Sequence, residues 1–235
     1  MLYIQKEKRR PLLVLGFLGM VLFAIGDVLL QSFSKDGAAL LVIMSSTIQD
    51  MPMGRLYFTL LTGVIAAPFM YLGLCAVDAR LRDALGEQKG KMYRVFQIGA
   101  TIGTLSFFAA HSVCAVLEMS VKLTLLSGVS PETVERVYRA PFLISFGVTN
   151  LWVTVTEVCL SVVYIYYVLK KIFPLPKTAA ILNTVGFYMI FTAAGAALTG
   201  ITGNELFSLL AKSGASLGMG VMFLAVANVC GREAG

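Results

Sequence analysis

Six apolar stretches, each long enough to form a helix that crosses a lipid bilayer, restrict the fold of this chain more than any other feature. A bilayer core about 30 Å thick requires about 20 apolar residues of α-helix, which rises about 1.5 Å per residue. The stretches lack the apolar and polar alternation of membrane β-barrel strands. We therefore predict an all-α polytopic membrane protein, a six-transmembrane-helix bundle with helices over residues 11–33, 56–77, 94–118, 141–169, 178–200 and 205–229.

The amino-acid composition indicates the same class. Hydrophobic residues make up 57% of the 235 residues and charged residues only 14%, whereas soluble domains average about 45–50% and about 25%. A soluble core of this length could not be covered with so little polar surface. The six helices leave few residues over, so residues 1–235 are predicted to form a single transmembrane domain.

The basic residues predict the orientation. Most of the 19 Lys and Arg residues fall in the N-terminal segment, the second and fourth loops and the C-terminus. Cytoplasmic loops of membrane proteins carry such an excess, so both termini are predicted to be cytoplasmic, in a multi-pass protein of the cell inner (plasma) membrane. Contacts of these residues with anionic lipid explain the net charge of +6. The lipid bilayer is thus an expected partner, and a nucleic acid is not.

Two outer loops contain recognisable signals. Residues 34–55 include the apolar run Ala38 to Met44, which is too short to span and predicts an interfacial or re-entrant segment, or an extension of the first helix. Ser130, followed by Pro131, begins a predicted short helix on the outer surface that runs through Val137. Pro141 then begins the fourth span. This helix serves as a connector, the favoured interpretation, or as a lid over an outward cavity.

Glycine positions predict where the helices approach one another. Gly residues in the apolar spans let two helix backbones come close together. Such residues include Gly16, Gly63, Gly103 and Gly218. They indicate a compact bundle and carry no information on activity.

Several kinds of active site are excluded by the residues available. His111 is the only histidine, so a tris-histidine zinc site is impossible. The chain has no nucleotide-binding or nucleophile-elbow motif, and its four cysteines lack metal-ligand spacing. We therefore expect no cofactor and no metal, with a mixed site of Asp27, His111 and Glu118 as the less favoured alternative.

Ionisable residues inside the predicted spans are the strongest functional signal. A charge at this depth costs roughly 2.5–3.5 kcal/mol on insertion scales, so each one is a candidate site residue. The ionisable candidates are Asp27, His111, Glu118, Glu157 and Lys212. Their polar companions within the spans are Asn150, Trp152 and Asn183.

Helical spacing brings these candidates together. Counted from the outer ends of the helices, Asp27 lies about 9 Å deep and His111, Asn150 and Lys212 lie about 12 Å deep. On the fourth helix, Asn150, Thr154 and Glu157 share one face at i, i+4 and i+7. Polar faces turn away from lipid. The pattern predicts a polar cavity between the first, third, fourth and sixth helices, open to the outside.

Proton transfer is the chemistry that these residues suit best. An imidazole titrates near neutral pH, so His111 with Glu157 or Asp27 is the candidate catalytic group. Asn150 and Trp152 would hold a small amphipathic or lipid-like ligand, with Glu118, Thr154 and Lys212 as further candidate ligand-binding residues. The alternatives are a small proton-coupled transporter or channel, and a structural or regulatory subunit in which Asp27 pairs with Lys212. The same residues serve an enzyme and a transporter, and protein partners are not indicated.

Short motifs along the chain resemble an uncharacterised bacterial six-helix integral membrane family, a domain of unknown function. The motifs are Gly26-Asp27, Met53-Gly54-Arg55, Pro68 with Tyr71-Leu72-Gly73, His111, Leu175-Pro176 with Asn183, and Ser216-Leu217-Gly218-Met219-Gly220. The resemblance implies topology and little chemistry. It draws attention to Asp27, Arg55, His111 and Asn183 as a group, with Arg55 and Asp27 as a possible pair, and so adds Arg55 and Asn183 to the candidate ligand-binding residues.

Overall fold

The computed structural model describes residues 2, 4–31, 39–40, 44–204, 207 and 210–232; for residues 31, 39–40, 44–47 and 211–212 it describes the backbone alone. Within these residues, six helices are long and apolar enough to cross a membrane. Their bounds are α1 Lys6–Gln31, α2 Met53–Leu85, α3 Lys91–Leu126, α4 Pro131–Leu169, α5 Thr184–Thr202 and α6 Leu210–Arg232. The predicted all-α, multi-pass membrane fold is confirmed.

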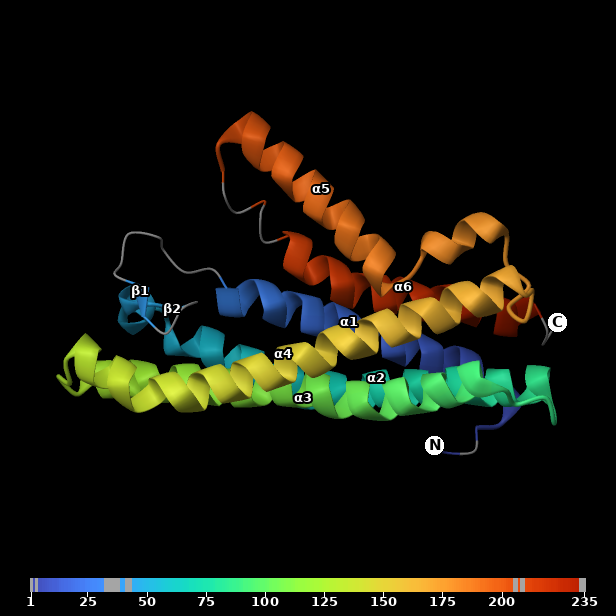
Figure 1. The fold of residues 1–235 in the computed structure, drawn as a ribbon, viewed down its shortest axis with the longest axis horizontal. Helices are drawn as coiled ribbons and strands as arrows, with labels where there is room; N and C mark the ends of the chain where they lie inside the picture. The colour runs from blue at the N-terminus through green and yellow to red at the C-terminus, as the bar shows by residue number, and fades with distance from the viewer. Residues whose placement is uncertain are drawn as a thin grey trace.

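The helices form a bundle in which consecutive members run in opposite directions (Figure 1). Helix α1 packs between α2 and α6, α3 packs against α2 and α4, and α5 packs mainly on α6. Figure 1 shows α5, in orange, diverging from the other helices toward its C-terminal end. Lys6 at the start of α1 and Arg232 at the end of α6 lie toward the same end of the bundle.

Helix α2 continues past its predicted end at residue 77, because the charges that follow are paired with each other. Asp78 is buried, with 1% of its surface exposed. Its carboxylate accepts a hydrogen bond from the Tyr93 hydroxyl at 2.9 Å and forms an ion pair with Arg82 Nε at 3.0 Å. Asp78 ends the apolar stretch of the sequence, but it does not end the helix. A charged side chain that is paired with neighbours one turn away is compatible with a continuing helix.

The fourth helix corrects a second prediction. Ser130 caps its N-terminus as expected, accepting a hydrogen bond from the Thr133 amide. The predicted separate surface helix is wrong, because α4 runs without a break from Pro131 through Pro141 to Leu169. Pro141 lies on an exposed face of α4. Membrane proteins tolerate an internal proline where the surroundings compensate for the missing backbone hydrogen bond.

The loop between α1 and α2 is folded onto α3 in its described part. Strands β1 (Ala39–Leu40) and β2 (Met44–Ser45) pair antiparallel, and the 3-10 helix η1 (Ser46–Asp50) follows. The predicted extension of the first helix is therefore wrong; the interfacial or re-entrant alternatives concern residues that lie partly outside the described part. Lys122 of α3 donates hydrogen bonds to the carbonyls of Ile48 and Gln49. The end of η1 is thereby fixed against the bundle.

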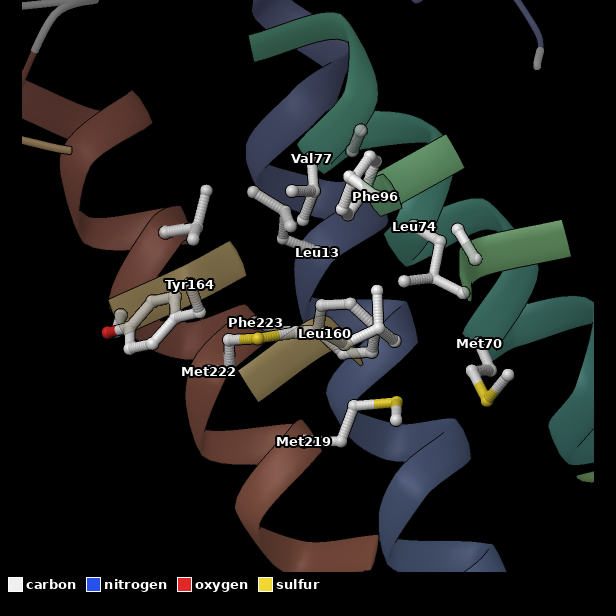
Figure 2. Close-up of a cluster of buried hydrophobic side chains, with 14 of the residues drawn as sticks. Leu13, Met70, Leu74, Val77, Phe96, Leu160, Tyr164, Met219, Met222 and Phe223 are labelled. Atoms are coloured by element: carbon white, nitrogen blue, oxygen red, sulfur yellow. The ribbon is translucent and has the colours of Figure 1, made fainter. Parts of the chain in front are cut away.

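The apolar core lies where α1, α2 and α6 meet, with α3 and α4 closing one side (Figure 2). Its centre is a backbone contact: a Cβ added at Gly16 of α1 would lie 2.8 Å from Gly73 Cα of α2 and 3.0 Å from the Phe223 ring of α6. An apolar side chain that moves from lipid into the protein interior gains no hydrophobic free energy, so the association of membrane helices depends on such close packing. The prediction from small residues is confirmed here.

We expect Gly16→Ala to lower the free energy of unfolding in detergent micelles by about 1–3 kcal/mol, because its methyl group would overpack this contact. Gly147→Ala on α4 is the matched control, since nothing lies within 4 Å of a Cβ at that position. The control is expected to be neutral or stabilising by up to about 1 kcal/mol, from helix propensity alone. Denaturant titration followed by circular dichroism measures both, and equal midpoints would contradict the proposed helix contact.

Candidate functional site

A cavity of about 560 Å³ lies within the bundle, beside α4 and the first turns of α5. Its walls come from α1, α3, α4 and α6, the four helices named in the prediction, and also from α5, which the prediction left out. The polar lining residues are Asp27, His111, Cys114, Glu118, Asn150, Thr154, Glu157, Tyr188 and Ser216. The apolar lining residues are Leu30, Phe107, Ala110, Phe146, Val153, Val158, Val185 and Ala215.

His111 is held in a slot between α1 and α2. A Cβ added at Gly63 of α2 would lie 2.6 Å from His111 Cβ, and one added at Gly26 of α1 would lie 3.0 Å from His111 Nδ1. The Phe23 ring packs 4.5 Å from the imidazole, centroid to centroid. The two glycines therefore leave the space that α3 needs to bring this buried side chain against α1.

Asp27 is held by two polar neighbours from different helices. Ser216 Oγ of α6 donates a hydrogen bond to Asp27 Oδ2 at 2.9 Å. His111 Nε2 of α3 lies 3.4 Å from Asp27 Oδ1. The contact joins α1, α3 and α6 at one carboxylate, and it orients the imidazole edge that faces this acid.

Glu118 is the most buried carboxylate of the cavity wall, with 4% of its surface exposed. Its Oε2 has no hydrogen-bond partner among the residues that the structure describes. Arg55 lies close enough to interact with this carboxylate electrostatically. The Arg55 guanidinium also donates a hydrogen bond at 2.6 Å to the Leu29 carbonyl, one of the last carbonyls of α1. Arg55 thus stabilises the end of α1, and its pairing with Asp27 stays a prediction.

The polar face predicted on α4 divides into two parts. Asn150, Thr154 and Glu157 line the cavity. Further along the same face, Ser161 Oγ accepts a hydrogen bond from the Val185 amide in the first turn of α5, at 3.2 Å. This bond fixes the start of α5 against α4. Ser161 therefore positions one wall of the cavity and does not belong to the described lining.

Two other predicted residues lie outside the described cavity lining. Trp152 has 43% of its surface exposed. A step of two residues from Asn150 turns it about 200° around the helix, away from the face that lines the cavity. Asn183 is buried and caps α5: its Oδ1 accepts from the Gly186 amide at 3.0 Å and its Nδ2 donates to the Ala180 carbonyl at 2.6 Å. Asn183 therefore has a structural role in the observed arrangement.

Lys212 is a predicted site residue whose side chain lies outside the described part of the structure. Its backbone is in α6, one turn before Ser216. The predicted pairing of Asp27 with Lys212 therefore also concerns a side chain outside the described part.

The alternative of a mixed metal site is not supported by the arrangement of the acids and the imidazole. In the part of the chain that the structure describes, no group of three His, Cys, Asp or Glu side chains is placed to hold one metal ion. Asp27 and His111 are in contact, but Glu118 does not join them as a third ligand. The groups can instead bind a ligand through hydrogen bonds and charge.

Sequence reasoning missed the residues that complete the cavity. Ser216 belongs to one of the short family motifs and is absent from the predicted site residues, although it is the hydrogen-bond donor to Asp27. Phe107, Val185 and Tyr188 belong to the apolar majority of the chain, and no pattern distinguishes them from lipid-facing residues. The one available signal was the serine itself, which lies among glycines on a helix that packs on two others.

Comparisons with known proteins point to a family and not to an activity. No curated protein and no solved structure matches the chain. One family matches almost its whole length, over residues 4–233, and its description is a family of unknown function (DUF6796). The resemblance to a domain of unknown function is confirmed by this match, and the chain belongs to that family.

Proposed function

We propose that this protein binds a small amphipathic or lipid-like ligand in the cavity between α4 and α5. The observation that carries the proposal is the mixed lining of one 560 Å³ cavity, which has Asp27, His111, Glu118 and Glu157 beside phenylalanine, valine and alanine side chains. Ligand pockets of proteins commonly enclose about 300–1,000 Å³ and combine apolar walls with a few polar groups. A headgroup would contact the polar residues while a chain lies along the apolar ones.

The surroundings of the cavity support entry of such a ligand from the bilayer. The lining residues Thr154 and Val158 of α4 and Tyr188 of α5 are exposed. Helix α5 diverges from α4 in Figure 1 and packs mainly on α6. Lipid chains surround this side of a membrane helix bundle, so an amphiphile would reach the cavity sideways, between α4 and α5.

The proposed location is the inner (plasma) membrane of a bacterial cell, with both termini in the cytoplasm. Arg80 and Arg82 near the end of α2 and Lys170 and Lys171 after α4 lie toward the end of the bundle that holds Lys6 and Arg232. An excess of basic residues favours the cytoplasmic side. Glu118 lies about two turns from the opposite end of α3, so the cavity would occupy the outer half of the membrane.

Filling the cavity tests the proposed binding. Dodecanol, dodecanoate and dodecylamine are offered to protein in nanodiscs, and saturable binding above empty nanodiscs is measured by equilibrium dialysis. We expect wild type to bind at least one of them, and Ala110→Trp to weaken that binding by about tenfold or more, because the indole occupies the ligand volume. Leu105→Trp on the exposed face of α3 is the control and should bind as wild type. Absence of saturable binding for all three would refute the proposal.

The orientation is tested with single cysteines in exposed loop positions. Ser127→Cys lies between α3 and α4, and Gln88→Cys lies between α2 and α3. We expect a membrane-impermeant maleimide added to whole cells to label the first variant and to label the second only after permeabilisation. The unmodified chain, whose cysteines are in helices, gives the background. The reverse pattern would place the termini outside.

Proton-coupled transport is the second candidate, and the Asp27 to His111 contact of 3.4 Å favours it, because such a pair can pass a proton. The test uses proteoliposomes with a pH-sensitive dye inside and permanently charged amphiphiles outside, dodecyltrimethylammonium or dodecyl sulfonate. Transport predicts an internal pH change that depends on the amphiphile and is lost in Asp27→Asn. Glu135→Gln, at an exposed ion pair with Arg139, is the control. Binding without any such pH change would leave ligand binding as the function.

A further inference from the structure

We propose that the ligand of this cavity is a cationic amphiphile whose headgroup is a protonated amine. This assignment rests on the proposed function and specifies the chemical class of its ligand. It is argued from the charges of the described lining, from the hydrogen-bonding capacity that those side chains leave unused, and from the apolar surface beside them.

Three of the ionisable groups among the described lining residues are carboxyl groups, and no lysine or arginine side chain belongs to that described lining. Asp27, Glu118 and Glu157 come from three different helices, and all three line the same cavity. Asp27 and Glu157 line the same cavity from α1 and α4, so any negative charges on them would face a shared space. Like charges at low dielectric repel strongly, and a cation between them would remove that repulsion. An anionic headgroup would add to it.

Two donors of the lining are used within the protein, whereas one of its buried acceptors has no partner among the described residues. The hydroxyl of Ser216 donates to Asp27, and the amide Nδ2 of Asn150 donates to the Phe146 carbonyl. Glu118, by contrast, has 4% of its surface exposed and an Oε2 with no hydrogen-bond partner among the described residues. A buried acceptor without a donor is costly, so this wall of the cavity is complementary to a group that donates hydrogen bonds. A protonated amine supplies both the donors and the charge.

Among the described side chains, the acids of the cavity lining outnumber the basic groups that act on them. Arg55 acts on Glu118 from α2, and it also binds the Leu29 carbonyl. Lys212 precedes Ser216 by one turn of α6, and its side chain lies outside the described residues. Glu157 lies on the opposite wall, on α4, beside the apolar residues Val153 and Val158.

The apolar lining indicates the second part of the ligand. Phe107, Val153, Val158 and Val185 lie beside the acids on the cavity wall. A small hydrophilic amine would leave this surface without contacts, whereas an alkyl chain attached to the amine would cover it.

The experiment compares headgroups on one chain and neutralises one acid at a time. Binding of dodecylamine, dodecanol and dodecanoate is measured with protein in nanodiscs near neutral pH, where the amine is protonated. The variants are Glu118→Gln and Glu157→Gln, which keep the shape of the side chain. Glu135→Gln is the control, because Glu135 forms an exposed ion pair with Arg139 and does not belong to the described lining.

We expect wild type to bind dodecylamine at least about tenfold more tightly than dodecanol or dodecanoate. Each of the two cavity variants should lose about tenfold in dodecylamine affinity and retain dodecanol binding, which also shows that the variant is folded. Equal or tighter binding of dodecanoate, or undiminished dodecylamine binding in both variants, would overturn the cationic assignment while leaving the amphiphile cavity intact. Failure of all three compounds to bind wild type would refute the proposed function itself.

Discussion

The close approach of α1, α2 and α3 around His111 is the contact on which the cavity depends. Gly26 and Gly63 leave the room for the imidazole, since a Cβ at either position would meet it at 3.0 Å or less. With the imidazole in that slot, its Nε2 reaches Asp27, and Ser216 of α6 reaches the same carboxylate from the other side. Apolar side chains gain little by leaving lipid for a protein interior, so close contacts and polar bonds of this kind hold a membrane bundle together.

The position of α5 follows from a few polar contacts at its start. Asn183 caps the helix, and Ser161 of α4 accepts a hydrogen bond from the Val185 amide. Beyond that point α5 packs on α6, where Gly218 admits the Phe187 side chain: a Cβ at Gly218 would lie 2.7 Å from Phe187 Cβ. Because the start of α5 is fixed to α4 and its remainder diverges, Val185 and Tyr188 become one wall of the cavity.

Charged side chains at the two ends of the bundle are held by different kinds of partner. At the end of the bundle where α1 begins and α6 ends, Asp78 is paired with Arg82 and Tyr93, and Arg9 is paired with Asp83 at 2.6 Å. Toward the other end, Lys122 is bound to backbone carbonyls of the loop between α1 and α2, while the Glu118 carboxylate one turn away retains an oxygen without a partner among the described residues. Buried polar groups in proteins are nearly always bonded, and this oxygen belongs to a residue of the cavity wall.

The sequence alone determined the class of protein, the number of spans and most of the polar residues of the cavity, because a charge in an apolar stretch is visible without coordinates. It placed Asp27, His111, Glu118, Asn150, Thr154 and Glu157 on a shared site, and all six line the cavity. Only the tertiary structure decided which polar residues are structural: Asn183 caps a helix and Arg55 binds the end of α1. It also showed that Pro141 does not begin a helix and that α5 forms a wall. These outcomes depend on which helices touch and at what angle, and the periodicity of one helix carries no information about the face its neighbour presents.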